Sequence, residues 1–179
     1  MNPILDMLMN AGGGGAVQQV GQRFGLSEDQ TSSALSQLVP AVMAGLQRNA
    51  SQEGGMDALT SALRSGNHGE YLDNPEMLTQ EATTEDGNSI LGHIFGSKDV
   101  SRAVAGRAAE QTGIGADVLK KMLPVVAAMV MGGLSKRTAA VPPGSPGASG
   151  GLLSSLLDRN HDGSIADDVM GMMGRFLRR

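Results

Sequence analysis

The stretch "MLPVVAAMVMGGL", Met122 to Leu134, is the longest apolar run in this chain of 179 residues. It holds thirteen residues, with Pro124 at its third position. A helix needs about 20 apolar residues to span a bilayer, so this run is too short to do so. We interpret it as part of a buried helix in a soluble protein without a transmembrane segment.

The surroundings of this run repeat an earlier part of the chain, which predicts an internal duplication. "GQRFGLSEDQTSSALSQLVPAVMAGLQR", Gly21–Arg48, is matched in outline by "AEQTGIGADVLKKMLPVVAAMVMGGLSKR", Ala109–Arg137. A shorter apolar element, "NPILDMLM" at 2–9, recurs in outline as "NSILGHIFG" at 88–96. Each half should therefore hold a short apolar element, a helix that stops at a glycine, and a longer helix interrupted by proline.

Two glycine pairs and one proline pair mark corresponding places in the halves. They are Gly25 with Gly113, Gly45 with Gly133, and Pro40 with Pro124. The first pair predicts left-handed helix stops, because glycine adopts positive φ readily. Proline removes a backbone donor and clashes with the preceding turn, so each proline should kink its helix or divide it.

Apolar residues recur at helical spacing, and no stretch shows the alternation of a β-strand. The expected inward faces are Val17, Val20 and Phe24; Ala34, Leu35, Leu38, Val42 and Leu46; Met56, Leu59 and Leu63; Val100 and Val104; and Val118, Met122, Val126, Met129 and Val130. Ser27 with Gln30 predicts a capping box, and Asn74 before Pro75 predicts another helix start. The fold class is therefore all-α and multihelical.

Composition divides the chain into a domain, a linker and a tail. Residues 1–137 form the duplicated helical domain, with halves at about 1–66 and 88–137. Residues 138–151 are rich in Pro, Gly, Ser and Ala and are interpreted as a flexible linker. Residues 152–179 form a short helix–loop–helix appendage at the C-terminus.

The tail contains "DRNHDGSIADD", Asp158 to Asp168, which is similar to an EF-hand or dockerin-like calcium loop. That template places oxygen ligands at positions one, three and five, a glycine at six, a carbonyl at seven and a bidentate acid at twelve. The matching residues are Asp158, Asn160, Asp162, Gly163 and Ser164. These residues predict one Ca²⁺ ion as the cofactor of the tail.

The twelfth position of this loop holds Val169, so the template is degenerate. Asp168 would close a contracted loop, with Asp167 as the alternative. Without bidentate closure the affinity should be weak. The competing interpretation is a polar, Asx-rich turn that binds no metal.

The helical domain offers few candidates for catalysis. We expect His93, on a short apolar helix, to bond a neighbouring backbone group. His68, Glu70, Tyr71 and Asp73 fall in a predicted loop and could form a site, although such a group is ordinary in a loop. "AGGGGA" at 11–16 lacks the Lys-Ser/Thr of a phosphate loop and reads as a flexible connector.

Charge and cysteine content exclude several classes of function. The net charge is −4 and aromatic residues make up 2% of the chain, so no nucleic-acid surface is expected. No cysteine is present, which excludes disulfides and thiolate metal sites. The N-terminus lacks the basic residues of a signal peptide, which favours a cytoplasmic location.

The tandem halves, "ILGHIFG" at 90–96, the Leu-Pro motif at Leu123-Pro124 and the acidic tail resemble the YidB-like bacterial family of unknown function. The resemblance covers residues 1 to about 137 and implies a duplicated multihelical fold and no particular activity. The chain departs from the motif in its first half, where Val39 separates Leu38 from Pro40.

These features favour a non-catalytic structural or protein-interaction module, not an enzyme. Self-association is one form of interaction considered, because the methionines and small residues of 122–134 could leave an apolar face exposed after the monomer packs. A core role for the same methionines is the simpler interpretation. The alternative function is an enzyme or small-molecule binder that uses a cleft between the halves, near His93.

Overall fold

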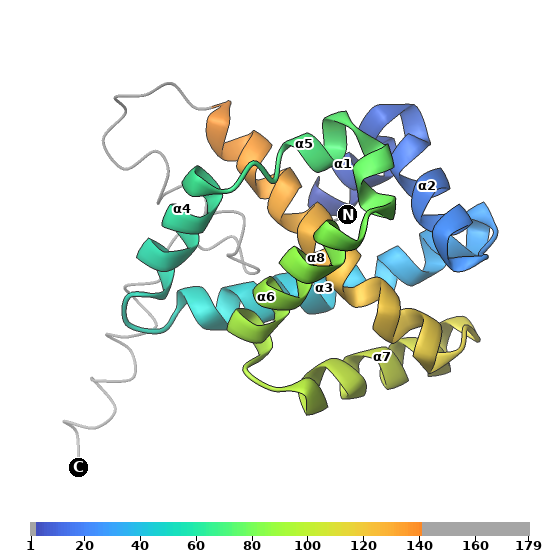
Figure 1. The fold of residues 1–179 in the computed structure, drawn as a ribbon. Coiled ribbons are helices and arrows are strands. Elements are labelled where there is room, and N and C mark those ends of the chain that lie inside the picture. The colour runs from blue at the N-terminus through green and yellow to red at the C-terminus, as the bar shows by residue number, and fades with distance from the viewer. Residues whose placement is uncertain (1–2, 141–179) are drawn as a thin grey trace, which may run out of the picture.

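Helices make up the regular structure of residues 3–140, the part of the chain that the computed structural model describes (Figure 1). The described part begins with α1 (Pro3–Asn10), the 3-10 turn η1 (Ala11–Gly14), α2 (Gly15–Phe24) and α3 (Glu28–Ala50). These are followed by α4 (Gly55–Ser65), α5 (Glu70–Asp73), the 3-10 turn η2 (Pro75–Thr79), α6 (Glu81–Phe95), α7 (Lys98–Thr112) and α8 (Ala116–Ala139). Residues 3–140 contain no strand, which confirms the all-α prediction. The predicted tail and nearly all of the predicted linker lie outside the described residues.

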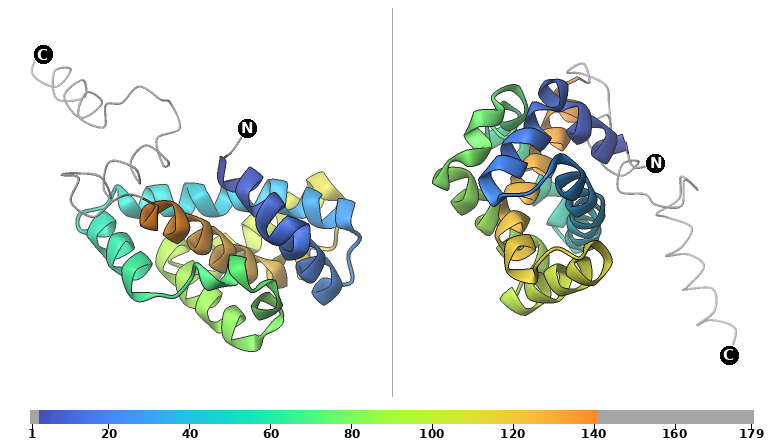
Figure 2. Two further views of the ribbon diagram at one scale, coloured as in Figure 1. Left: turned by 90° about the horizontal axis from the view of Figure 1, so that it is seen from above. Right: turned by 90° about the vertical axis from the view of Figure 1, so that its right-hand side faces the viewer.

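The last helix, α8, forms the centre of the domain. It contacts all seven other α-helices of the described part, and Figures 1 and 2 show it passing between them. Every residue from Met122 to Leu134 is buried. The expectation that this run leaves an apolar face exposed is therefore wrong, and its methionines are core residues.

The length of α8 also differs from the sequence-based interpretation. Its 24 residues are long and apolar enough to cross a membrane by composition, because the helix extends beyond the thirteen-residue run. However, 78% of its most apolar 18-residue window is buried inside the domain. A helix that is apolar on all sides is buried either in a membrane or in the core of a protein. In this structure the other helices of the domain bury α8.

The other long helix, α3, is amphipathic as predicted. Its five predicted inward residues, Ala34 to Leu46, are at most 2% exposed. The capping box is confirmed: Gln30 N–H donates to Ser27 Oγ at 3.2 Å, and Ser27 N–H donates to Gln30 Oε1 at 3.1 Å. Pro40 lies on the outward side and is exposed.

Neither proline divides its helix, because α3 continues through Pro40 and α8 through Pro124. The prolines are also not equivalent in position. Both glycine pairs are separated by 88 residues, whereas the prolines are separated by 84. This displacement is about one helical turn. Pro40 is exposed and Pro124 is buried.

The matched glycines do end their helices as predicted. Gly25 after α2 has φ 67°, and Gly113 after α7 has φ 71°. Each is followed by an apolar residue and then by a long helix. The predicted start of the second half at residue 88 falls inside α6, which begins at Glu81.

Glycines also permit the closest helix contacts. A Cβ on Gly87 of α6 would overlap the carbonyl group of Pro124 on α8. A Cβ on Gly45 of α3 would lie 2.6 Å from the Phe95 ring. The first contact is with backbone and the second with the end of a side chain.

Three local predictions are wrong. Val104 packs against the core as predicted, but Val100 is 36% exposed, since α7 buries the small side chains of Ala105 and Ala108. The glycine run is the 3-10 turn η1 rather than a flexible connector. Pro75 does begin η2, but the Asn74 side chain makes no capping bond there.

Candidate functional site

The most chemically distinctive group of the described residues joins three consecutive parts of the fold. His68 lies in the turn after α4, Tyr71 on α5 and Asp86 on α6. His68 Nδ1 lies 3.1 Å from Asp86 Oδ2, and the Tyr71 hydroxyl donates to the same oxygen at 3.0 Å. The sequence prediction grouped His68 and Tyr71 with Glu70 and Asp73 in a loop, whereas the last three lie on the short helix α5, and it missed Asp86.

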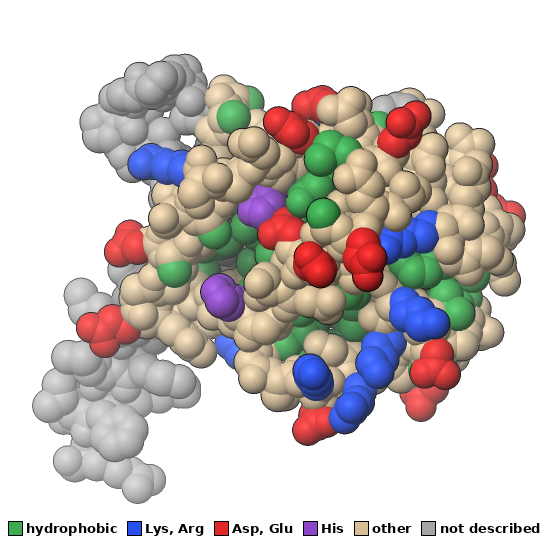
Figure 3. All heavy atoms as spheres, viewed as in Figure 1, with side chains coloured by type: hydrophobic (Ala, Val, Ile, Leu, Met, Phe, Trp, Pro, Cys, Tyr) green, Lys and Arg blue, Asp and Glu red, His purple; other side chains and the backbone are tan. Residues whose placement is uncertain are grey.

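The backbone around His68 is held closely. A Cβ on Gly132 of α8 would overlap the His68 carbonyl oxygen, and a Cβ on Gly66 would overlap the imidazole ring. His68 is only 8% exposed. The imidazole therefore occupies a fixed place between the end of α4, the centre of α8 and the carboxylate on α6. Figure 3 shows a histidine beside an acidic side chain at the surface of this region.

Tyr71 titrates far from its ordinary range. Burial, together with the hydrogen bond to Asp86 and the charge of that carboxylate, raises the pKa of the phenol from 10.0 to about 12. The phenol is therefore a hydrogen-bond donor at physiological pH. The protonated Tyr71 phenol orients the Asp86 carboxylate and is a poor base.

Two further bonds tie the same region to α8. The Lys136 ammonium pairs with Asp73 on α5. Ser135 Oγ donates to the Leu63 carbonyl near the end of α4 at 3.4 Å. Asp73, which was grouped with the candidate site, thus faces α8 rather than His68.

A second polar group, centred on Arg23 of α2, was missed from the sequence. Its guanidinium donates to the carbonyls of Leu78 and Gln80 at the end of η2 and to Thr84 Oγ1 on α6, the last at 2.7 Å. It also lies 5.5 Å from the centre of the Phe24 ring. A cation is favourable at the carbonyl end of a helical turn. The bonds of Arg23 therefore connect α2 to η2 and α6.

His93 does not take the predicted role. Its imidazole is exposed on α6, and it is the backbone carbonyl of His93 that accepts a bond, from Asn49 Nδ2 at 3.0 Å. The region near His93 therefore contributes one exposed ring, not a group of converging polar side chains. The nearest apolar residue, Ile94, points inward and is 8% exposed.

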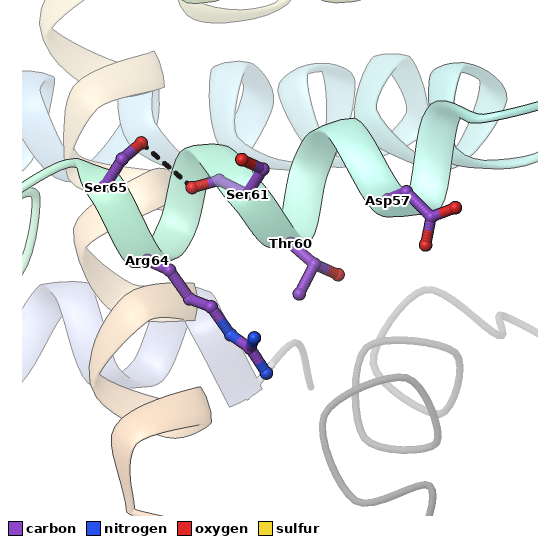
Figure 4. A pocket seen from close by; sticks show the side chains of 5 residues that line it. All are labelled: Asp57, Thr60, Ser61, Arg64 and Ser65. Atoms are coloured by element: carbon purple, nitrogen blue, oxygen red, sulfur yellow. Dashed lines mark hydrogen bonds between the residues drawn. The ribbon is translucent and has the colours of Figure 1, made fainter.

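A hollow of about 430 Å³ lies along α4 (Figure 4). The described residues that line it are Asp57, Thr60, Ser61, Arg64 and Ser65, all from this one helix. Ser65 Oγ donates to the Ser61 carbonyl at 2.9 Å and so bonds its own helix. One helix face supplies no converging groups for chemistry.

Among residues 3–140, no three His, Asp, Glu or Cys side chains are placed to hold a metal ion. The predicted calcium ligands lie outside the described residues. They are Asp158, Asn160, Asp162, Ser164 and Asp168, with Asp167 as the alternative closing acid.

The sequence matches the profile of a family described as bacterial protein of unknown function (DUF937) over residues 6–137. This match runs from within α1 to the last turn of α8 and covers most of the chain, so the protein belongs to that family. No curated protein and no solved structure matches the chain significantly.

Proposed function

We propose that this member of the family is a non-catalytic structural and protein-interaction protein that associates with itself, and whose tail binds calcium weakly. The observation that carries the proposal is the use of polar side chains in the helical domain. Asp86 on α6 accepts a hydrogen bond from Tyr71 on α5 and lies beside His68 in the turn after α4. Such bonds fix helices in place, as a scaffold requires.

The geometry of Asp86 supports this role. One carboxylate oxygen accepts the hydrogen bond of the Tyr71 hydroxyl and lies 3.1 Å from His68 Nδ1, so both side chains converge on the same atom. Arg23 is committed in the same way to two carbonyls and one hydroxyl. Buried polar groups that are fully bonded favour one arrangement of the helices over others.

We also propose that the domain consists of two related three-helix units, α1–α3 and α6–α8. The support is the shared order of two shorter helices and one long helix, together with the positive-φ glycines Gly25 and Gly113. The motif "ILGHIFG" at 90–96 and the Leu123-Pro124 pair further place the chain near the YidB-like members.

The calcium proposal rests on the sequence of the tail. Asp158, Asn160 and Asp162 occupy alternate positions before Gly163, as oxygen ligands do in the calcium-loop template. Binding would neutralise a group of four aspartates, and it would order the loop because the unbound carboxylates repel one another.

Calorimetric titration of the full chain with calcium tests this proposal. The wild type should give saturable heat at about millimolar calcium or below, and Asp158→Ala with Asp162→Ala should abolish it. Asp57→Ala, which removes an exposed acid from α4, is the matched control and should leave the heat unchanged. A wild type without heat at millimolar calcium would contradict the proposal.

A second candidate, a small-molecule binder or enzyme, is favoured by the His68–Asp86 pair, in which Nδ1 lies 3.1 Å from Oδ2, since an imidazole beside a carboxylate can act as a general base. The sequence-based form of this hypothesis placed a cleft between the halves near His93, whereas this pair lies beside α5. A small molecule that raises the Tm of the wild type but not that of His68→Gln would favour this candidate over the first.

A further inference from the structure

Charge is divided unevenly along the chain. Residues 66–97 contain six acidic residues and no Lys or Arg, while residues 98–137 contain seven Lys or Arg and three acidic residues. The net charge of −4 hides this division. The boundary falls between α6 and α7.

The acidic part forms a surface over α5, η2 and the start of α6, which we call the acidic face. Its exposed members are Glu70, Glu76, Glu81 and Glu85. The other two acids of the segment are engaged, Asp73 with Lys136 and Asp86 with His68 and Tyr71. Arg23 borders this face through its bonds to Gln80 and Thr84. The four exposed glutamates make no ion pair within the described residues.

The basic part forms a surface over α7 and the start of α8, the basic face. Its exposed cations are Lys98, Arg102, Arg107, Lys120 and Lys121. Three acids lie among them: Asp99, which pairs with Arg102 at 2.9 Å, Glu110 and Asp117. Five cations against three anions leave an excess of two positive charges. Figure 3 shows acidic side chains toward the upper middle of this view and most basic side chains below them, over α7.

The basic face also contains Val100, the one exposed large hydrophobic residue of the described part, at 36%. Val104 lies one turn further along α7 and Arg107 nearly one turn beyond it, so the three share one side of the helix.

We propose that the basic face of one copy of this chain docks on the acidic face of a second copy. This rests on the proposed self-association and specifies its surface. The partner is a second copy because the chain itself carries a surface of opposite charge. Both faces are visible from one side of the molecule, so a two-fold dimer would form the same contact twice.

The physics of such a contact predicts its salt dependence. Exposed ion pairs contribute little each, so several must act together, and their attraction is screened within about 8 Å at physiological ionic strength. The dimer should therefore form at low ionic strength and dissociate in salt. Association through an apolar interface would instead be strengthened by salt or hardly changed.

Sedimentation of the full chain without calcium tests the surface apart from the tail. One variant, Val100→Glu with Arg107→Glu, makes the basic face acidic, and another, Glu81→Arg with Glu85→Arg, removes the net negative charge of the acidic face. Each alone should weaken self-association about tenfold or more, and an equal mixture should associate again as a heterodimer. Arg48→Glu with Arg64→Glu, exposed and outside both faces, is the matched control and should behave as wild type.

Two results would overturn the assignment: a wild type that stays monomeric at low salt, or association that both reversed variants retain. The second result would leave the proposed self-association standing and reject only this surface. Calcium heat in the tail is independent of either result, so failure of the calcium proposal is recognised separately. Circular dichroism of each variant confirms that the helices are retained.

Discussion

The helices α3 and α8 come from the two stretches of sequence that we propose to be related, and yet they occupy different environments. They have 23 and 24 residues, each contains a proline, and each buries one of the matched glycines, Gly45 or Gly133. α3 exposes one side to solvent, whereas α8 is buried all round from Met122 to Leu134. Local sequence therefore specifies the helix and its stop, and position in the packed domain specifies how much of it is buried.

The outward positions explain the difference. α3 exposes Ser36 and Pro40, whereas Pro124 and Ala128, which lie 88 residues later on α8, are buried. Solvent surrounds one side of α3. Other helices surround α8, and the polar ties of His68, Asp73 and Ser135 are made beside it.

The largest expected effect comes from filling a backbone contact of α8. Gly87→Ala should destabilise the domain by about 3 kcal/mol or more, because the new Cβ meets the backbone of Pro124, which cannot move alone. For comparison, Gly45→Ala on α3 should lower the stability by about 1 kcal/mol or less, since the Phe95 ring that its Cβ meets can turn aside. Urea unfolding measures both, and equal losses would remove the distinction between the helices.

The two prolines provide the next comparison. Pro40→Ala should stabilise the protein by about 1–3 kcal/mol, because an exposed helix position gains a backbone donor and loses a ring clash. Pro124→Ala should change stability by about 1 kcal/mol or less, because the gained bond is offset by a small void in the core. Thermal unfolding of the two variants checks this, and the reverse order would contradict the assigned burial.

The hydrogen bond between Tyr71 and Asp86 can be observed by titration of Tyr71, the one tyrosine in a chain without tryptophan. The folded phenol should titrate at about 12 and the unfolded one near 10.0. Because the folded protein holds the proton more tightly, this contribution to stability is present below pH 10 and is lost as the pH rises toward 12. Phenolate absorbance in native protein and in denaturant measures both values.

The variant Asp86→Asn sharpens that measurement. It removes the carboxylate charge and keeps the burial, so the pKa of Tyr71 should fall but stay above 10.0. The exposed carboxylate variant Glu85→Gln, one residue away, serves as the control. A pKa unchanged by Asp86→Asn would show that the hydrogen bond is absent in solution.

The smallest effect on folding is expected on α7, whose buried residues are the small side chains of Ala105 and Ala108. Val100→Ser should change the free energy of unfolding by about 0.5 kcal/mol or less, since the side chain is 36% exposed. Ala108→Ser, on the buried side of the same helix, should cost more because a hydroxyl enters the core. Denaturant unfolding compares the two variants. A larger loss of stability for Val100→Ser than for Ala108→Ser would show that Val100 is a core residue.

The sequence predicted much of the fold because helix periodicity, capping and glycine stops are local signals. The inward face of α3, the Ser27–Gln30 box and the stops at Gly25 and Gly113 are all confirmed. The face of α7 was wrong because valine is the more hydrophobic residue, while close packing selected Ala105 and Ala108. The full burial of α8 depends on contacts with seven helices that no local pattern contains.

The candidate site was predicted only in part for the same reason. His68 and Tyr71 were recognised as neighbours in sequence, but Asp86 lies fifteen residues beyond Tyr71 and carries no motif. Arg23 bonds residues more than fifty positions away, so only the folded chain brings them together. The calcium loop of the tail remains a prediction from sequence.

The central claim is that α8, the helix with the longest apolar run, is the core of the described residues, which leaves the charged faces as the proposed surfaces for association. Because the chain has no cysteine, single cysteines at Ala44 on α3 and Ala128 on α8 can report it directly by their rate of reaction with a thiol reagent. Ala44→Cys should react at once in the native protein, and Ala128→Cys at least about a thousandfold more slowly, through unfolding alone. Equal rates in the folded protein would contradict the account, because α8 would then be accessible.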